Sequence, residues 1–132
     1  EPSYVSLDTA LSLYSIIPDV AAAVTSVTTR PTREFRNDYG VFIYKSCKEE
    51  AFTGYRLTNY EGFKILIADE EKAFVDFIYY RLRSGRSLDW SEERFNKQIM
   101  AKASWSKIIR YAGLLNDKIV KLAKESREYF RC

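Results

Sequence analysis

The chain has 132 residues, a net charge of +3, ten Tyr and eight Phe, but no His and two Cys. Its length predicts one domain over residues 1–132, with enough aromatic side chains for a substantial core. The lack of His and the wide separation of Cys47 and Cys132 exclude common zinc-binding motifs and favour reduced thiols, as in the cytoplasm. No apolar run is long enough to predict a membrane-spanning helix.

The first predicted element is a helix. Ser6 is a suitable helix cap, and apolar residues at helical spacing predict a helix over 7–17. Pro18 cannot continue this helix and would end it. The β-branched residues of 21–29 then predict a strand.

Strand and turn signals continue to residue 62. Residues 41–46 alternate in two phases, Val41, Ile43 and Lys45 against Phe42, Tyr44 and Ser46. Together with the turn residues of 37–40, this alternation predicts a hairpin between 24–35 and 41–46. A third strand is expected over 52–59, before a turn at 61–62.

A short apolar run and the segment after it form the centre of the predicted domain. Residues 63–68 are apolar except for Lys64, and the run is too short for a surface helix, which favours a buried strand. Asp69 can cap the following helix, and Glu70 and Glu71 match the positive end of its dipole. Because nearly every residue from 73 to 82 is apolar or aromatic, we expect this helix to be buried centrally.

The remaining residues predict a helical tail over 88–131. Asp89 and Glu92 have the spacing of a reciprocal cap, which favours a helix over 91–102. Further apolar stripes predict two more helices with a bend near 113–116, the second starting at Asn116. The strands and first helices are thus predicted in residues 3–83 and the helical tail follows them. This order of elements indicates an α+β fold with a small antiparallel or mixed sheet, a central buried helix and a C-terminal helical bundle.

Signals of catalysis are few. The sequence has no His for acid–base work, no phosphate-binding glycine loop and no Gly-x-Ser-x-Gly motif. One acidic group could bind a divalent cation in a nuclease-type site, namely Asp69, Glu71 and Asp76 with Lys72. The structural interpretation is helix capping and a Lys72–Asp76 pair one turn apart, and we favour it. We therefore expect no catalytic residue, metal ion or cofactor.

The basic residues are unevenly distributed. Residues 1–80 contain 8 basic and 12 acidic side chains, whereas residues 81–132 contain 13 and 6, which suggests an anionic partner for the second part. The candidate nucleic-acid or partner contacts are Arg30, Arg33, Arg36, Lys107, Arg110, Lys121, Lys124 and Arg127. The arginines near the hairpin could bind phosphate or carboxylate, or could protect a sheet edge from pairing. The tail residues could follow a DNA backbone, or could be the solvated side of a helix.

Three segments stand out together: residues 4–11 continuing to 16–18, residues 24–33, and residues 67–76. They read YVSLDTAL with IIP, VTSVTTRPTR, and IADEEKAFVD. In this order and spacing they resemble the effector domain of AbiEi-type antitoxins, which are described as transcriptional regulators of a viral defence, or abortive infection, system. Two positions depart from the family pattern: Ser15 stands where Gly is common, and Glu70 stands where Pro is common.

The resemblance implies a cytoplasmic antitoxin of a type IV toxin–antitoxin system, acting as an autorepressor that counteracts a nucleotidyltransferase-like toxin. In such systems a stable complex with the toxin is not required. Family members usually carry a winged helix before this domain, which binds operator DNA, and these 132 residues do not include it. The alternatives are a metal-dependent nuclease-like domain and a basic DNA-backbone-binding module.

Overall fold

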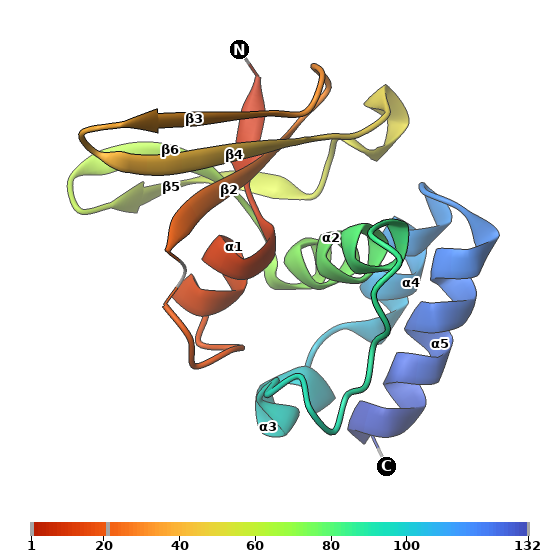
Figure 1. Cartoon of the computed structure of the whole chain (residues 1–132). Coiled ribbons are helices and arrows are strands. Elements are labelled where there is room, and N and C mark those ends of the chain that lie inside the picture. The colour runs from red at the N-terminus through yellow and green to blue at the C-terminus, as the bar shows by residue number, and fades with distance from the viewer. Residues whose placement is uncertain (1, 21, 132) are drawn as a thin grey trace.

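The computed structural model describes residues 2–20 and 22–131, so Glu1, Ala21 and Cys132 lie outside the described residues (Figure 1). Within them the fold is α+β, as predicted, and combines one mixed sheet with helices. The strands are β1 (Ser3–Val5), β2 (Ala23–Thr28), β3 (Arg33–Asn37), β4 (Gly40–Ser46), β5 (Tyr55–Tyr60) and β6 (Phe63–Ala68). The helices are α1 (Leu7–Leu13), α2 (Glu70–Arg83), α3 (Lys97–Ala101), α4 (Trp105–Gly113) and α5 (Asp117–Arg131), with a 3-10 turn at η1 (Glu49–Ala51).

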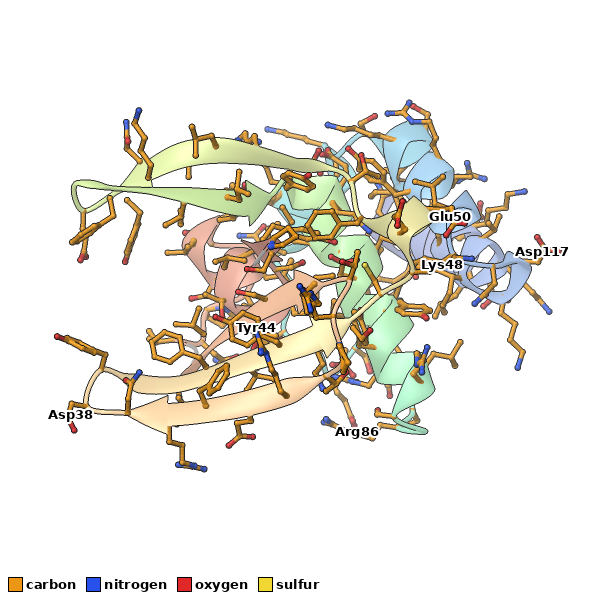
Figure 2. All side chains as sticks on the ribbon, turned by 90° about the horizontal axis from the view of Figure 1, so that it is seen from above. Asp38, Tyr44, Lys48, Glu50, Arg86 and Asp117 are labelled. Atoms are coloured by element: carbon orange, nitrogen blue, oxygen red, sulfur yellow. The ribbon has the colours of Figure 1, made fainter. Side chains whose placement is uncertain are left out.

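The sheet has the strand order β3-β4-β2-β1-β6-β5 and is held together by the short strand β1. β1 pairs antiparallel with β2 and parallel with β6, the latter at Val5 and Ile67. The chain then leaves the sheet and α1 begins at Leu7. As a result, the β3–β4 and β5–β6 hairpins project as two separate arms (Figure 2).

One predicted strand pairing is wrong. The turn at 38–39 does form a hairpin, but its strands are β3 and β4, with Asn37 opposite Gly40. β2 lies on the other side of β4 and pairs with it in parallel, from Ala23 opposite Val41 to Thr28 opposite Ser46. Residues 30–32 leave the sheet, which allows β3 to take the outer edge and β2 to remain inside.

The first helix is shorter than predicted because the chain reverses sharply after it. α1 ends at Leu13, and Ser15 adopts a left-handed conformation with φ of 62°. The Ile16 N–H then donates to the Leu11 carbonyl at 2.9 Å. Ile16 is thereby turned back into the core, where it is fully buried.

The predicted helix over 91–102 is also wrong, because α3 covers only Lys97–Ala101. The cap of α3 is Asn96, whose side chain accepts from the Ile99 N–H at 3.0 Å. Residues 89–95 are irregular, and Trp90 and Phe95 instead direct their rings onto the central helix. Aromatic packing therefore overrides the local capping signal in this segment.

α2 is the buried central helix that the sequence predicts, and its residues 72–78 are buried. It lies between α1 on one side and α4 and α5 on the other (Figure 1). The Phe74 ring is surrounded at centroid distances of 5.3–6.1 Å by Trp90, Phe95, Trp105 and Phe130. This cluster joins the helical tail to the rest of the domain.

The end of the chain follows the prediction closely. α4 ends at Gly113, and Asn116 caps α5 by accepting from the Ile119 N–H at 3.0 Å. Cys47 is a free, half-buried thiol. No helix in the described part of the chain is both long and apolar enough to span a membrane.

Candidate functional site

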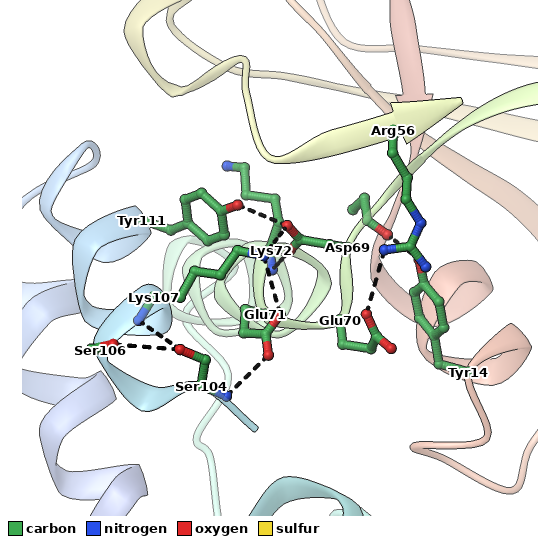
Figure 3. Close-up of polar contacts among 11 residues, drawn as sticks. Tyr14, Arg56, Asp69, Glu70, Glu71, Lys72, Ser104, Ser106, Lys107 and Tyr111 are labelled. Atoms are coloured by element: carbon green, nitrogen blue, oxygen red, sulfur yellow. Dashed lines mark hydrogen bonds and ion pairs between the residues drawn. The ribbon is translucent and has the colours of Figure 1, made fainter. Parts of the chain in front are cut away.

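Asp69 links the start of α2 to α4. Its Oδ1 accepts from the Lys72 N–H at 2.7 Å, which is the predicted helix cap. Its Oδ2 accepts from the Tyr111 hydroxyl at 2.7 Å and lies 2.9 Å from the Lys107 ammonium (Figure 3). Burial, with a smaller effect from the bond to Asp69, raises the pKa of Tyr111 to about 12. The carboxylate is thus engaged at both oxygens by groups that hold two helices together.

The neighbouring acids have similar partners. Glu71 accepts from the Ser104 N–H at 3.0 Å and lies 3.7 Å from the Lys107 ammonium, so it joins α2 to the start of α4. Glu70 lies 3.7 Å from Arg56 on β5, and both side chains are about half exposed (Figure 3). The bond to Asp69 is the largest cause of a raised pKa for Lys107.

Asp76 belongs to a second, buried network. Its Oδ2 accepts from the Tyr4 hydroxyl at 2.9 Å and the Ser6 hydroxyl at 2.7 Å. Its Oδ1 accepts from the Lys72 ammonium at 3.0 Å, and Lys72 and Asp76 are 1% and 2% exposed. Ser6 makes no side-chain cap bond to α1, because its hydroxyl is directed to Asp76 instead. Burial is the main reason that the pKa of Tyr4 is raised well above its usual value.

These contacts decide what the acidic group can do chemically. The candidate nuclease residues are divided, since Asp69 and Glu71 share Lys107 whereas Asp76 is bound by Lys72. Within 2–20 and 22–131, no three His, Cys, Asp or Glu side chains are placed to hold a metal ion. Each carboxylate has a structural partner, and the Lys72–Asp76 pair is the one predicted from its spacing.

The three candidate arginines near the hairpin lie on or beside β3, an exposed edge strand. The Arg33 guanidinium lies over the Phe35 and Tyr44 rings, at 4.9 and 5.3 Å from their centroids. Arg36 lies 3.4 Å from Glu34, and Arg30 is exposed in the segment before β3. Arg36 on the outermost strand fits the edge-protection interpretation, while Arg30 remains exposed to solvent.

The five candidates in the tail are not equivalent. Lys107 is bound to acids of α2 and belongs to the Asp69 cluster. Arg110 is exposed beside the Tyr111 ring, 5.7 Å from its centroid. On α5, Lys121 and Lys124 are exposed, whereas Arg127 is half-buried. The structure therefore leaves part of the predicted basic stripe available to solvent.

Another basic surface includes Lys45 and Lys48, which the sequence places near the arginine cluster of the hairpin but does not predict to form a separate site. A groove of about 710 Å³ lies between β4, the second half of α2 and the α4–α5 connection, and its lining includes Lys45, Lys48 and Arg83. The signal was present in the alternation of 41–46, because Lys45 shares its phase with Val41 and Ile43. Because alternate side chains of a strand point to the same face, Lys45 lies on the face of β4 that carries Val41 and Ile43.

Comparison with the models of known protein families finds no match, and no curated protein matches the sequence.

Proposed function

We propose that this chain is the effector domain of an AbiEi-type antitoxin, which counteracts a nucleotidyltransferase-like toxin without catalysing a reaction itself. In the full-length protein, a winged helix outside this chain would bind operator DNA and repress transcription. The main support comes from the two positions where the sequence departs from the family pattern, Ser15 and Glu70. At both positions the backbone geometry suits the residue that is common in the family.

At Ser15 the backbone favours glycine. Its φ of 62° lies in the left-handed region, where an L side chain is strained and Gly is not. The turn is needed because the Ile16 N–H must reach the Leu11 carbonyl and the Ile16 side chain must reach the core. A family preference for Gly here is what this turn would produce.

At Glu70 the backbone accepts proline. Glu70 is the first residue of α2, where the N–H has no partner within the helix and where Pro is over-represented. The preceding residue, Asp69, has φ of −69° and ψ of 171°, which is the extended conformation that a following Pro requires.

The three segments that carry the resemblance also meet in the structure. β1 from the first segment pairs with β2 from the second, with Tyr4 opposite Val27. Tyr4 and Ser6 of the first segment then donate to Asp76 of the third. Residues that are spread over more than seventy positions thus form one connected set of contacts, which supports reading them as a single family pattern.

A growth-rescue experiment tests the proposal. The gene beside the one that encodes this protein is cloned under an inducible promoter, and the full-length antitoxin is co-expressed with it. We expect a nucleotidyltransferase-like toxin that arrests growth and an antitoxin that restores it. Arrest that the full-length protein leaves unchanged would overturn the proposal.

A matched variant separates this proposal from the nuclease alternative. Glu71→Gln keeps the size of a side chain that accepts from the Ser104 N–H but removes its charge. A regulator whose acids are structural keeps its rescue activity with this change. A metal-dependent nuclease that uses Glu71 would lose activity by orders of magnitude.

The second candidate, a DNA-backbone module, is favoured by one observation on α5. Lys121 and Lys124 are exposed and form no ion pair with any described carboxylate. A gel-shift assay of this chain on duplex DNA, with Lys121→Gln/Lys124→Gln for comparison, tests it. Binding that is insensitive to salt or to the double substitution would contradict the module.

A further inference from the structure

The groove beside Lys45 has the charge of an anion-binding site. Lys45, Lys48 and Arg83 line it, and none of its described lining residues is Asp or Glu. None of the three forms an ion pair with a described carboxylate, unlike Arg56, Lys107 or the buried Lys72. Their positive charge is therefore not neutralised by the protein and is available to a ligand.

The position of Lys45 is the most informative feature of the groove. In the parallel pairing of β2 and β4, Lys45 lies opposite Val27, so both side chains are on the same face of the sheet. Val27 is fully buried in the core on that face, yet none of the acidic side chains that the structure describes forms an ion pair with Lys45. Lys45 is half-buried and lines the groove, so its positive charge faces a space that a ligand can enter.

Lys48 and Arg83 each make a hydrogen bond within the protein, and each keeps further N–H groups for a ligand. The Lys48 ammonium donates to the Leu115 carbonyl at 2.8 Å, which uses one of its three protons. Arg83 is in the last turn of α2 and donates to the Tyr79 hydroxyl at 2.7 Å, so most of its five N–H groups remain. Figure 2 shows Lys48 beside the helical layer, where the end of β4 approaches it.

The size and walls of the groove narrow the class of ligand. A volume of about 710 Å³ is within the range of small-molecule sites. Tyr79 and Tyr80 also line the groove, with Arg83 over the Tyr79 ring, and the Tyr80 hydroxyl already donates to the Ser46 carbonyl at 2.6 Å, so the Tyr80 ring offers mainly its apolar surface. An adjoining cavity shares Lys45, Tyr80 and Ser84, but its lining includes Asp8 beside Arg86, so the uncompensated positive charge belongs to the first groove.

We propose that this groove binds the phosphate chain of a small polyphosphate ligand of nucleotide size, with Lys45, Lys48 and Arg83 as its phosphate contacts. Several cations around one opening match two or three linked phosphates better than a single anion. Tyr79 and Tyr80 give the groove an aromatic part of its lining, which a flat ring next to the phosphate chain could contact. Phosphate binding in this groove does not depend on the proposed antitoxin function. Failure of either proposal would leave the other unaffected.

Calorimetric titration of the 132-residue chain tests this proposal. The probes are inorganic triphosphate, ATP, AMP and a duplex oligonucleotide. We expect saturable binding of triphosphate and ATP, with AMP weaker by about tenfold or more because it lacks two of the phosphates. Equal affinity for triphosphate and ATP assigns the contacts to the phosphate chain alone, whereas tighter ATP binding adds the nucleoside.

Substitutions locate the site. Lys45→Gln should weaken triphosphate binding about tenfold or more, since one charge-assisted contact is lost. Lys64→Gln, the same change on the exposed β5–β6 arm, should alter affinity by no more than about twofold because distant charges are screened. Arg83→Gln replaces Lys45→Gln if the latter does not give a folded circular dichroism spectrum. No phosphate binding at millimolar concentration, binding of the duplex alone, or equal weakening by Lys64→Gln overturns the proposal.

Discussion

The Ser6 hydroxyl donates to Asp76 Oδ2 at 2.7 Å and joins the start of α1 to the middle of α2 across 70 residues of sequence. The same oxygen accepts from Tyr4, and the other carboxylate oxygen accepts from the buried Lys72 ammonium. Asp76 is thus the point where β1, α1 and α2 are held together. The network is closed, because no buried side-chain polar atom among the described residues lacks a partner.

Replacing Asp76 should therefore destabilise the domain strongly. In Asp76→Ala the Lys72 ammonium is left buried without a counter-charge, and the loss should be about 3–5 kcal/mol in the free energy of unfolding. Urea denaturation followed by circular dichroism measures it. Ser6→Ala removes one donor and should cost about 1–3 kcal/mol. An Asp76→Ala variant no less stable than Ser6→Ala would show that the ion pair contributes little.

A second prediction concerns alkaline pH. The pKa of Tyr111 is about 12 in the folded chain compared with the ordinary tyrosine value of 10.0, because the hydroxyl is buried and bound to Asp69. Since the folded-state pKa is the higher one, the stabilisation is complete below about pH 10 and is lost as the pH rises through 12. This increase in the pKa of Tyr111 corresponds to about 2–3 kcal/mol in the free energy of unfolding. The raised pKa of Lys107 acts in the same direction.

Tyr111→Phe separates this effect from general alkaline unfolding. The variant cannot ionise at this position, so its free energy of unfolding should fall less steeply between pH 10 and 12 than that of the unmodified chain. At pH 7 it should be less stable by about 1–3 kcal/mol, because the Asp69 oxygen loses a donor. Urea titrations at several pH values give both quantities. Parallel pH profiles for the two proteins would assign the alkaline loss to other groups.

Local signals explain which parts of this fold the sequence could predict. The junction of β6 and α2 was correct to the residue, because an apolar run, an Asp cap and the helix dipole act within a few positions of one another. The pairing of β2 with β4 differs from the prediction. Parallel pairing joins segments that are separated in the sequence, and local patterns do not show which segments will pair. Likewise, Trp90 and Phe95 leave a helical pattern to reach Phe74.

The candidate sites show the same division. The Lys72–Asp76 pair followed from its i,i+4 spacing, but the donation from Ser6 to Asp76 did not, since Ser6 has the local signature of a helix cap. Lys107 was grouped with the basic tail, whereas the packing of α4 on α2 places it against Asp69. Whether a cation meets an acid or solvent depends on packing between elements.

Ser15→Gly should stabilise the domain. The left-handed conformation of Ser15 costs an L residue about 1–2 kcal/mol, while the added freedom of Gly in the unfolded chain offsets part of the gain. We expect a net increase of up to about 1 kcal/mol in the free energy of unfolding, measured by urea denaturation. Ser12→Gly is the matched control within α1 and should instead lose about 0.5–1 kcal/mol. A loss of stability in both variants would show that the turn at Ser15 is not strained.

Glu70→Pro tests the other departure from the family pattern. Because Glu70 is the first residue of α2 and Asp69 is already extended, the ring should be accommodated without moving the helix. The exposed pair with Arg56 is lost, and such a pair contributes about 0–1 kcal/mol, so the free energy of unfolding should change by less than about 1 kcal/mol.

Ala73→Pro is the control, because it places the proline ring inside α2 and not at the first residue of the helix. The Ala73 N–H donates to the Asp69 carbonyl at 2.9 Å, so proline there removes the first bond of the α2 ladder and clashes with that carbonyl. We expect a loss of about 3 kcal/mol or more, or an unfolded chain, by urea denaturation. If Glu70→Pro were as damaging as Ala73→Pro, α2 would have to begin before Glu70. The structural case for the family resemblance at this junction would then be lost.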